Sequence, residues 1–523
     1  MDGLATPVRY VLERNARERP DEQFVQFENG DTWTRVQGLQ AAHAAARVLR
    51  AAGVRRGDRV AVFLPNGEDF LRAWWGICFL GAVIVPVNLA LRGAVLENLI
   101  ALGQPTAVVL PESADDQFAS APSGAAVRHV RPADLRAPLP GPADPLELDG
   151  ELQVWDPHMM LLTSGTSGPS KLVELSYQAS HVGGTWLLRD WGATGEDVFL
   201  VDLPLFHAAA LWQVTQALDV GVRLAIRSQP DLRNYWDVAR ATGATIGYLL
   251  SSMVPYLLAQ PERPEDKQHK LRLMVAAPLP ADIGSFAARF GIAAILTGYG
   301  STEVPGCTTT APGRELKPGS CGHVRAGFEV RIVDDHDFEV PVGTVGELVV
   351  RPDQPWSILT CYVDNPAAQA TAFRNGWFHT GDLMRIDDDG YFFFVDRKKD
   401  AVRRRGENVS AFEVEGAANA FAGVQESACV AHPSADIDDD VKVWVLPRPG
   451  AVIDPEKLFL HLVDQLPYFM VPQYVEVADD LPRTSTAKVQ KFLLREWGNS
   501  DRTWDRSAAG YKLSRRGLER NGG

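Results

Sequence analysis

Cysteine is scarce in this chain of 523 residues, and its placement excludes one class of protein. The five cysteines stand at positions 78, 307, 321, 361 and 429, and no two of them form a C-x-x-C pair. A disulfide scaffold is therefore excluded, and a structural zinc site is disfavoured because such sites need clustered ligands. Scattered cysteines of this kind suit a reducing compartment.

Long hydrophobic runs are also missing. The most apolar stretch, residues 74–87, is interrupted by Gly and Pro and is shorter than the ~20 residues that a membrane-spanning helix needs. The first 20 residues are charged and lack the apolar centre of a signal peptide. We therefore expect a cytoplasmic protein, in which residues 74–87 form a buried helix followed by a buried strand.

Basic residues are outnumbered, with 52 Lys and Arg against 66 Asp and Glu and a formal net charge of −14. Proteins that bind nucleic acid gain affinity by neutralising phosphates, so this balance argues against that class. The hydrophobic fraction of 46% and the charged fraction of 23% are ordinary for globular proteins and rule out a disordered or fibrous chain. The length predicts two or three domains.

Short apolar runs alternate with helical patterns through the first 300 residues, which predicts parallel sheets covered by helices on both faces. A strand pair is expected at residues 23–34, turning at Asn29 and Gly30. Residues 118–150 have weak periodicity, and we interpret them as a variable surface connection. The predicted buried strands lie at 59–65, 82–88, from 107 onward, 197–206, 222–227, 244–250, 271–277 and 293–300.

The pattern changes after Gly319. Strand-rich segments with Gly turns predict a small antiparallel or barrel-like unit, and a compact α+β module begins at about residue 400. Helices are expected in this module at 411–421 and near 456–465. From Ser500 the chain is polar and rich in Arg and Gly, so we expect it to be disordered.

The most informative segment is LLTSGTSGPSK, residues 161–171. Small hydroxylated residues and glycines after an apolar strand can wrap backbone N–H groups around an anion, and Lys171 adds a positive charge. The segment is not a Walker A loop, because Leu172 follows the lysine and the glycine spacing differs. It is not a nucleophile elbow either, because Gly165 and Gly168 are one residue too close together. Taken alone, it is equally compatible with a flexible turn.

Four further segments, in a fixed order, favour a phosphate-binding loop over a flexible turn. Together with the loop they resemble the signature motifs of the acyl-adenylate-forming superfamily, which holds acyl- and aryl-CoA synthetases, carrier-protein adenylation domains and luciferases. The resemblance covers residues 5–497 or so, and within the superfamily it points to ligases of the crotonobetaine/carnitine and aryl-CoA type. The four segments are GYGSTE (298–303), GWFHTGDL (376–383), DRKKDAVRRRGENVSAFEVE (396–415) and LPRTSTAKVQKFLLR (481–495).

This resemblance implies an α/β fold in three parts. A large N-terminal domain of βα-layered parallel sheets with a small barrel-like subdomain would span 1–398. A small, mobile C-terminal α+β domain would span 399–499, followed by the tail at 500–523. The implied reaction has two halves: a carboxylate attacks the α-phosphate of ATP to give an acyl-adenylate and pyrophosphate, and a thiol then displaces AMP. The implied cofactors are ATP and Mg²⁺, with CoA as co-substrate.

The resemblance also assigns roles in the ATP site. The loop from Thr163 to Lys171 would hold the β- and γ-phosphates, and Tyr299 would stack near adenine. Asp382 would bond both ribose hydroxyls, and Arg397 would reach the ribose–phosphate region. The residues expected to bind ATP are Thr163, Ser164, Gly165, Thr166, Ser167, Gly168, Lys171, Ala276, Ala277, Pro278, Tyr299, Gly300, Ser301, Thr302, Asp382 and Arg397.

Three residues are the expected catalytic groups. Lys488 matches the family lysine that bridges the substrate carboxylate and the α-phosphate during adenylation. Glu303 is the expected Mg²⁺ ligand, because that cation prefers oxygen donors, and Thr163 is a weaker one. His207 resembles the aromatic gate over the acyl site. The first half-reaction gathers negative charge, so cations and N–H dipoles should carry most of the catalysis.

The second half-reaction is expected to use the C-terminal domain. Lys399 falls at the hinge about which that domain rotates, and Gly406 would border the pantetheine tunnel. Arg403, Arg404 and Arg405 would steer the CoA phosphates. Two departures from the family pattern stand out: Ala487 precedes Lys488 where Gly is usual, and the phosphate loop ends in Ser170-Lys171-Leu172 where Pro-Lys-Gly is commoner.

The acyl pocket is placed by motif offsets at Phe206, His207, 247–251, Ala277 and 304–307. No Lys or Arg lies in these segments, which favours a neutral acid, aromatic or short and unsaturated, over a dicarboxylate or a betaine. Two alternatives remain open for the reaction. The acceptor could be the pantetheine of a carrier protein, or ATP could activate nitrite for diazotisation of an aryl amine in secondary metabolism. A degenerate, non-enzymatic homologue is disfavoured because Lys488, Glu303 and Asp382 are all present.

Overall fold

The computed structural model describes most of the chain. The described residues are 4–136, 146–163, 171–251, 253–277, 279–280, 282–398, 402–404, 407–409, 411–434, 439–466, 468, 470–483, 489–514 and 517–520. None of the helices in these ranges is long and apolar enough to cross a membrane.

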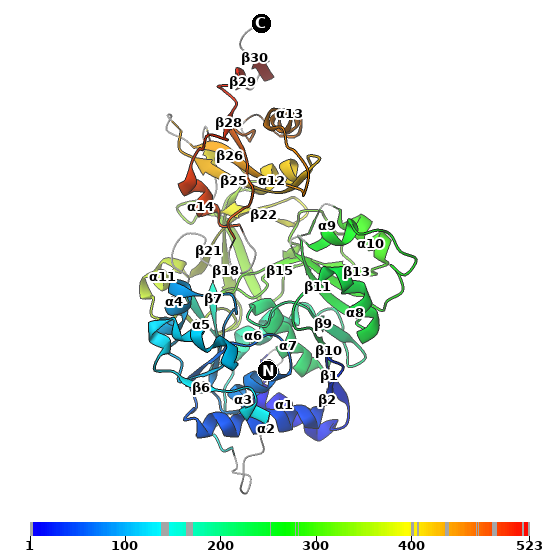
Figure 1. The fold of residues 1–523 in the computed structure, drawn as a ribbon, viewed down its shortest axis with the longest axis vertical. Helices are drawn as coiled ribbons and strands as arrows, with labels where there is room; N and C mark the ends of the chain where they lie inside the picture. Colours follow the sequence, from blue (N-terminus) through cyan, green and yellow to red (C-terminus); the bar gives the residue numbers. More distant parts are fainter. Residues whose placement is uncertain are drawn as a thin grey trace.

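Two seven-stranded sheets form the large domain (Figure 1). The first contains β1 (Gln23–Phe27), β2 (Thr32–Thr34), β9 (Val198–Val201), β10 (Arg223–Ile226), β11 (Ile246–Leu250), β12 (Leu273–Ala277) and β13 (Ala294–Leu296). Its order is β13-β12-β11-β9-β10-β1-β2, and only β2 is antiparallel to its neighbour. The β1–β2 pair confirms the predicted hairpin, in which Gly30 has a φ of 90° that glycine adopts without strain.

The second sheet carries the predicted phosphate loop. It contains β3 (Arg59–Val62), β4 (Val83–Pro86), β5 (Ala107–Val109), β6 (Arg128–Val130), β7 (Pro157–Thr163), β8 (Lys171–Ser176) and β19 (Cys361–Tyr362). The order is β19-β8-β7-β4-β3-β5-β6, parallel from β6 to β7 and antiparallel at β8 and β19. Strand β6 lies in the segment that we interpreted as a surface connection. For residues 128–130 that interpretation was wrong, because they form the edge strand of the sheet and Val130 is buried.

Helices make five layers with the two sheets. A shared core between the sheets is built with α1 (Val8–Glu18), α2 (Arg35–Ala51), α3 (Glu68–Phe79), α6 (Tyr177–Thr185) and α7 (Ala208–Val220). The outer face of the first sheet packs on α8 (Tyr235–Thr242), α9 (Met253–Leu258) and α10 (Ile283–Phe290). The outer face of the second packs on α4 (Gly93–Gly103) and α5 (Asp115–Ala119). Strands buried on both faces explain the continuous apolar runs of the sequence.

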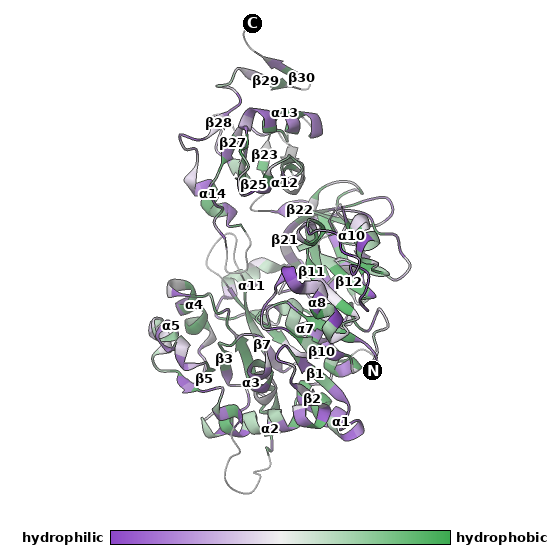
Figure 2. Ribbon diagram, turned by 45° about the vertical axis from the view of Figure 1, so that its right-hand side comes forward, coloured by the Kyte–Doolittle hydropathy of each residue, from purple (hydrophilic) through white to green (hydrophobic). Residues whose placement is uncertain are grey.

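An antiparallel subdomain follows, as predicted after Gly319. Five strands pair along the path β17-β18-β21-β20, with β22 added to β21, and three short strands pair as β14-β15-β16. Their bounds are β14 (Gly298–Tyr299), β15 (Thr308–Thr309), β16 (His323–Val324), β17 (Phe328–Val333), β18 (Gly346–Pro352), β20 (Phe373–Arg374), β21 (Trp377–Ile386) and β22 (Phe392–Arg397), with helix α11 at Pro366–Ala372. Figure 2 shows hydrophobic residues at the centre of the large domain and hydrophilic residues along the surface side of helices such as α1.

The C-terminal α+β module has its own buried core. The predicted helices appear as α12 (Ala411–Asn419) and α13 (Pro455–Gln465), beside α14 (Lys491–Trp497). Its sheet has the order β25-β26-β27-β28, and a separate hairpin pairs β23 with β24. The strands are β23 (Val402–Arg404), β24 (Glu407–Val409), β25 (Val424–His432), β26 (Asp440–Pro447), β27 (Tyr474–Val477) and β28 (Trp504–Asp505).

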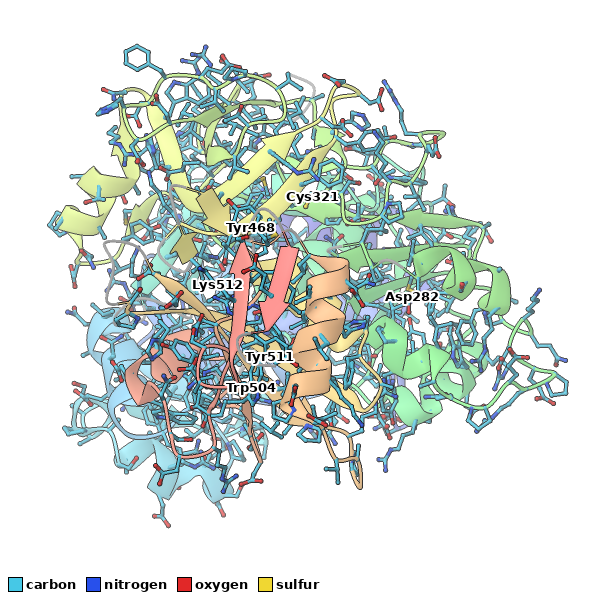
Figure 3. The ribbon with its side chains drawn as sticks, turned by 90° about the horizontal axis from the view of Figure 1, so that it is seen from above. Asp282, Cys321, Tyr468, Trp504, Tyr511 and Lys512 are labelled. Carbon is cyan, nitrogen blue, oxygen red and sulfur yellow. The ribbon has the colours of Figure 1, made fainter. Side chains whose placement is uncertain are left out.

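The expectation of a disordered tail was wrong for the described residues after Ser500. Strand β28 pairs with β27, and β29 (Tyr511–Ser514) pairs with β30 (Gly517–Arg520). Tyr511 is buried in one cluster with Phe459 of α13, and its hydroxyl donates to Glu456 of the same helix at 2.6 Å. Figure 3 shows Trp504 and Tyr511 beside α13, where both rings pack against Phe459. Polar composition hid this order because a few aromatic residues anchor the segment.

Candidate active site

The hairpin of β7 and β8 positions both ends of the predicted phosphate loop. Thr163 and Lys171 face each other as the last pair of this antiparallel ladder, and the Thr163 hydroxyl donates to the Lys171 carbonyl at 3.2 Å. The loop residues between them, Ser164, Gly165, Thr166, Ser167 and Gly168, lie outside the described residues. The hairpin therefore fixes where the loop leaves the sheet and where it returns.

Edge strand β19 links this hairpin to the predicted metal ligand. The ammonium of Lys171 lies 4.2 Å from the ring centroid of Tyr362, a cation–π contact. The Tyr362 hydroxyl in turn donates to the Glu303 carboxylate at 3.0 Å. Burial and the charge of Glu303 raise the pKa of Tyr362, so its phenol stays protonated and remains a donor. Sequence reasoning missed Tyr362, because only pairing of β19 with β8 brings it here.

A second cluster joins Tyr299, Asp382 and Arg397. Asp382 and Arg397 are cross-strand partners in β21 and β22, and the guanidinium lies 2.7 Å from one carboxylate oxygen. The other oxygen accepts the hydroxyl of Tyr299. Burial and the Asp382 charge raise the pKa of Tyr299 well above its usual range. Each carboxylate oxygen has two lone pairs, so Asp382 keeps capacity for further donors.

The residues after Tyr299 form a tight turn that leads to Glu303. The backbones of Ser301 and Val304 exchange hydrogen bonds at 3.0 and 3.2 Å, with Thr302 between them. A Cβ on Gly300 would lie 2.5 Å from the backbone nitrogen of Gly306, so only glycine fits at this position. The glycine and the tight turn of the GYGSTE motif thus place Tyr299 and Glu303 on one short segment of backbone.

The acyl-pocket prediction needs a correction at β11. Gly247 faces the outer helices, because a Cβ there would lie 2.6 Å from the hydroxyl of Tyr235. Since side chains alternate along a strand, Tyr248 points to the inner face, where its ring meets Trp186 edge-on at 6.5 Å. Of the segment 247–251, then, Gly247 cannot line an inner pocket. Sequence reasoning missed Trp186 because no motif contains it. Its indole also lies close to Gly306, where an added Cβ would be 3.1 Å from the ring.

The other predicted residues of this region fall at the ends of elements. Ala276 and Ala277 close β12, with Ala277 paired to Leu250 of β11, and Pro278 lies outside the described residues. His207 directly precedes α7, and its ring lies 4.7 Å from that of Phe206. Cys307 is fully buried, and its backbone N–H donates to the Tyr299 carbonyl at 3.0 Å.

The C-terminal predictions are only partly covered by the structure. Lys488, Lys399, Arg405 and Gly406 lie outside the described residues. Arg403 and Arg404 belong to the β23–β24 hairpin, opposite Asn408 and Glu407.

Comparison with known proteins fits this geometry. The model of the AMP-binding enzyme family matches residues 12–362, and that of the AMP-binding enzyme C-terminal domain matches residues 413–488. The chain belongs to the AMP-binding enzyme family. Crotonobetaine/carnitine–CoA ligases of Salmonella paratyphi B and Salmonella typhi are each 30% identical to it over 475 residues, covering 86% of this chain and 90% of theirs. It is thus an enzyme of the AMP-forming acid–CoA ligases, as the motifs predicted.

Solved structures of this family share the fold. ATP-bound MatB from Rhodopseudomonas palustris has a TM-score of 0.82 and 28% identity, covering 94% of this chain and 99% of that one. The anthranilate CoA ligase AuaEII, solved with anthranoyl-AMP, has a TM-score of 0.83 at 23% identity, covering 94% and 97%. MenE from Bacillus subtilis, solved with ATP and magnesium, has a TM-score of 0.82 at 22% identity, covering 92% of this chain and 98% of that one. These likenesses confirm the predicted fold class of two layered sheets, an antiparallel subdomain and a C-terminal α+β module.

The described donor set suits magnesium bound together with a nucleotide. No group of three or more His, Cys, Asp or Glu side chains in the described ranges is placed to hold a metal ion by itself. Mg²⁺ commonly uses one or two carboxylates and completes its shell with phosphate oxygens and water. Glu303, with the Thr163 hydroxyl at the start of the loop, fits that mode. These residues would hold the ion, and its positive charge would offset the negative charge of the phosphates.

Proposed function

We propose that the protein uses ATP to activate a small carboxylic acid, aromatic or short and unsaturated, as an acyl-adenylate with release of pyrophosphate, and then transfers the acyl group to CoA. The observation that carries this proposal is the cluster of Tyr299, Asp382 and Arg397. It gathers a buried carboxylate, a phenol and a guanidinium from three strands at one point. Such a set suits a ribose hydroxyl pair with a phosphate beside it.

The phosphate side of the site is supported independently. Tyr362 connects Lys171, at the end of the phosphate loop, to Glu303, whose carboxylate is able to bind Mg²⁺. The chain's own residues would therefore orient the triphosphate, while Lys488 would bring a positive charge to the acid carboxylate and the α-phosphate. Positioned cations of this kind stabilise charge that develops in the transition state.

The identity of the acid is proposed from the aromatic inner face. Trp186 and Tyr248 are buried and meet edge-on, which suits a flat or compact acyl group. Arg325 is buried next to Cys307, but its guanidinium donates to the Val182 carbonyl at 3.1 and 3.2 Å and so caps α6. Because the Arg325 guanidinium is bound to α6, it is not turned toward a second carboxylate on the acyl group. This arrangement suits a neutral substrate.

The test is pyrophosphate release from ATP across a panel of acids: aminobenzoates, benzoate, crotonate, malonate and betaine, each with and without CoA. We expect an aromatic or short unsaturated acid to give the highest rate and an acyl-CoA identified by mass spectrometry. Adenylation without acyl-CoA would favour a carrier-protein acceptor. Release that depends on nitrite and an aryl amine would replace this proposal with the diazotisation alternative, and malonate as the best substrate would contradict the neutral pocket.

The nucleotide assignment has its own variant. Asp382→Asn removes a charge that pairs with Arg397, and loss of a charge-assisted hydrogen bond costs ~1.5–3 kcal/mol, or about 10- to 100-fold. We expect AMP affinity, measured by calorimetry, to fall by that factor. The exposed Asp388→Asn in the turn after β21 is the matched control and should bind AMP like the wild type. Equal affinity of both variants would remove Asp382 from the site.

A further inference from the structure

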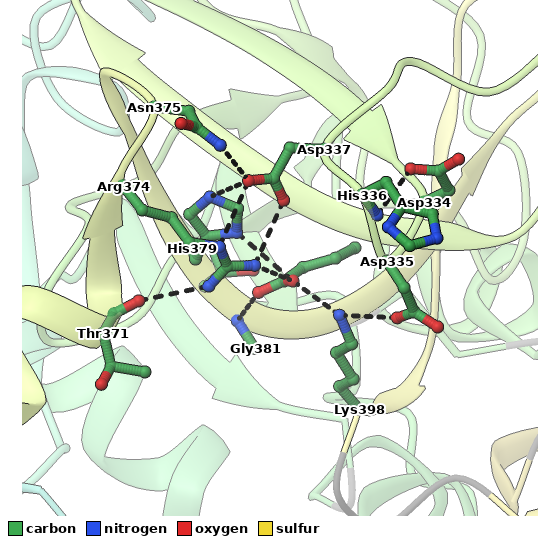
Figure 4. Close-up of polar contacts among 12 residues, drawn as sticks. Asp334, Asp335, His336, Asp337, Thr371, Arg374, Asn375, His379, Gly381 and Lys398 are labelled. Carbon is green, nitrogen blue, oxygen red and sulfur yellow. Dashed lines mark hydrogen bonds and ion pairs between the residues drawn. The ribbon is translucent and has the colours of Figure 1, made fainter.

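One buried carboxylate holds the residues that precede both Asp382 and Lys399. Glu347 of β18 is 4% exposed, and its Oε1 accepts the backbone N–H of Gly381 at 3.1 Å. Its Oε2 accepts the ammonium of Lys398 at 3.0 Å. Figure 4 shows Gly381 and Lys398 near His379 and Arg374, with the dashed polar contacts of this region. The two oxygens therefore serve two different segments of the chain.

The two segments are also joined to each other. The backbone N–H of Lys398 donates to the Gly381 carbonyl at 2.8 Å. Gly381 has a φ of 72°, in the left-handed region that favours glycine, and the pairing of β18 with β21 shifts register beside it, between Glu347 and Val349. Glu347, Gly381 and Lys398 thus form a closed unit that joins the irregular part of β21 before Asp382 to the end of β22.

Two basic side chains lie on the other side of Glu347. His379 lies 3.3 Å and Arg374 lies 3.4 Å from its Oε2, and both also face Asp337, at 3.7 and 3.2 Å. Burial opposes ionisation of Glu347, but the hydrogen bond and charge of Lys398, with His379, outweigh it and lower its pKa. The carboxylate is therefore charged, hydrogen-bonded and fixed in place.

We propose that Glu347 is a positioning residue for the adenylate-forming reaction, which orients Asp382 through Gly381 and anchors the near end of the interdomain hinge through Lys398. The inference rests on the proposed function, because it assumes that Asp382 contacts the nucleotide and that the chain turns at Lys399. A single buried carboxylate then couples the nucleotide site to the start of the hinge. Lys398 is the natural anchor, since it directly precedes Lys399 in the chain and its ammonium also lies 3.0 Å from Asp335.

Two substitutions separate the two roles of this carboxylate. Glu347→Gln keeps a carbonyl oxygen for the N–H of Gly381 but turns an amide NH₂ toward the ammonium of Lys398, so it spares Gly381 and breaks the contact with Lys398, together with the charge that faces His379 and Arg374. Lys398→Met breaks the same contact from the other side. Because both remove one interaction, the double variant should behave like either single variant. Glu347→Ala removes both contacts.

The test is amide hydrogen exchange of the full-length protein, followed in peptides that contain Lys398 or Gly381, with AMP affinity measured by calorimetry. We expect exchange at Lys398 to rise about ten-fold in E347Q, in K398M and in the double variant alike, since local opening follows the lost contact. In E347A, exchange at Gly381 should rise as well, and AMP should bind about ten-fold more weakly. The control is E329Q, an exposed acid of β17 that pairs with Arg331 and Arg351 away from this unit.

Three results would overturn the proposal: wild-type exchange at Lys398 in K398M, additive effects of E347Q and K398M, or the same increase in E329Q. Unchanged AMP affinity in E347A would remove the link to Asp382. If the wild-type protein itself bound neither AMP nor ATP, the proposed function would fail and the nucleotide role of Glu347 with it. The exchange comparison would still decide whether Glu347 anchors Lys398, so the two failures are distinguishable.

Discussion

The hydroxyl of Tyr362 donates a hydrogen bond of 3.0 Å to the carboxylate of Glu303, which lies 59 residues earlier in the chain. Tyr362 reaches this position because β19 pairs with β8, directly after the phosphate loop. The same phenol ring lies under the ammonium of Lys171. A neutral phenol therefore stands between the expected metal ligand and the cation of the loop, and it orients both.

We predict that Tyr362→Phe raises the Mg²⁺ concentration needed for adenylation. The variant keeps the ring and the cation–π contact but removes the donor that fixes the Glu303 carboxylate. A hydrogen bond to a charged group contributes ~1.5–3 kcal/mol, so the Mg²⁺ half-saturation should rise about ten-fold or more. It is measured from ATP–pyrophosphate exchange as Mg²⁺ is titrated. The exposed Tyr256→Phe is the control, and identical titrations of the two variants would contradict the role of Tyr362.

Much of the fold was predictable because the spacing of apolar residues along the chain matches the side chains that are buried in each helix and strand. Strands such as β3 and β12 are buried on both faces, so each reads as a short apolar run bounded by turn residues. The β1–β2 hairpin was predictable from Asn29 and Gly30 alone. The order of strands within each sheet was not, since it depends on which helices pack between the sheets.

The site was predictable only where a motif is local. Glu303 and Asp382 stand in short segments of recognisable pattern, whereas Tyr362 and Glu347 act through partners 59 and 34 residues away. The tail was misjudged for the same reason. Its order depends on contacts that composition does not register, among them the buried Lys442 ammonium, which donates to the Thr503 hydroxyl at 3.3 Å.

We predict that Lys488→Ala abolishes adenylation but largely spares thioester formation from a preformed acyl-adenylate. The lysine is expected to serve only the conformation in which the acid meets ATP, so its loss should not affect the later step. The measurement compares acid-dependent ATP–pyrophosphate exchange with acyl-CoA formation from the synthetic adenylate. Lys457→Met, on an exposed lysine of α13, is the control. Equal loss of both half-reactions, or of neither, would show that Lys488 has a different role.

We predict that His158 makes the stability of the protein fall as pH drops below about 6.5. His158 is fully buried, its Nε2 accepts the indole N–H of Trp74 at 3.2 Å, and its Nδ1 lies 2.9 Å from the Ser180 hydroxyl. Burial disfavours the charged imidazolium and lowers the pKa of His158 to about 3. Between about pH 6.5 and 3 the unfolded chain therefore binds a proton that the folded chain does not.

The sign of this effect is testable. Each pH unit in that window should cost ~1.4 kcal/mol of unfolding free energy, so a change from pH 6.5 to 5 costs about 2 kcal/mol from this group. His158→Gln should remove that slope in urea unfolding followed by tryptophan fluorescence, although it lowers stability at neutral pH. The exposed His336→Gln should keep the wild-type slope. A slope that survives in the His158 variant would show that other groups cause it.

The last prediction concerns the arginines expected to meet CoA, Arg403, Arg404 and Arg405. Replacing all three by Ser removes three positive charges from a segment that would face a phosphorylated nucleotide, after the domain has turned. Pyrophosphate exchange should therefore stay intact, while the apparent KM for CoA rises at low ionic strength. Charges in solvent are screened over ~8–10 Å at physiological salt, so the difference from the wild type should shrink as salt is added.

A control with the same loss of charge makes this decisive. Ser substitutions at three exposed arginines of the large domain should leave the KM for CoA unchanged at every salt concentration; these arginines are Arg17, Arg189 and Arg233. If both triple variants raise the KM equally, the effect follows from net charge alone. If neither does, the arginine run is a solvated face. The carrier-protein and nitrite alternatives, neither of which needs a site for CoA phosphates, would then account better for a protein that forms adenylates.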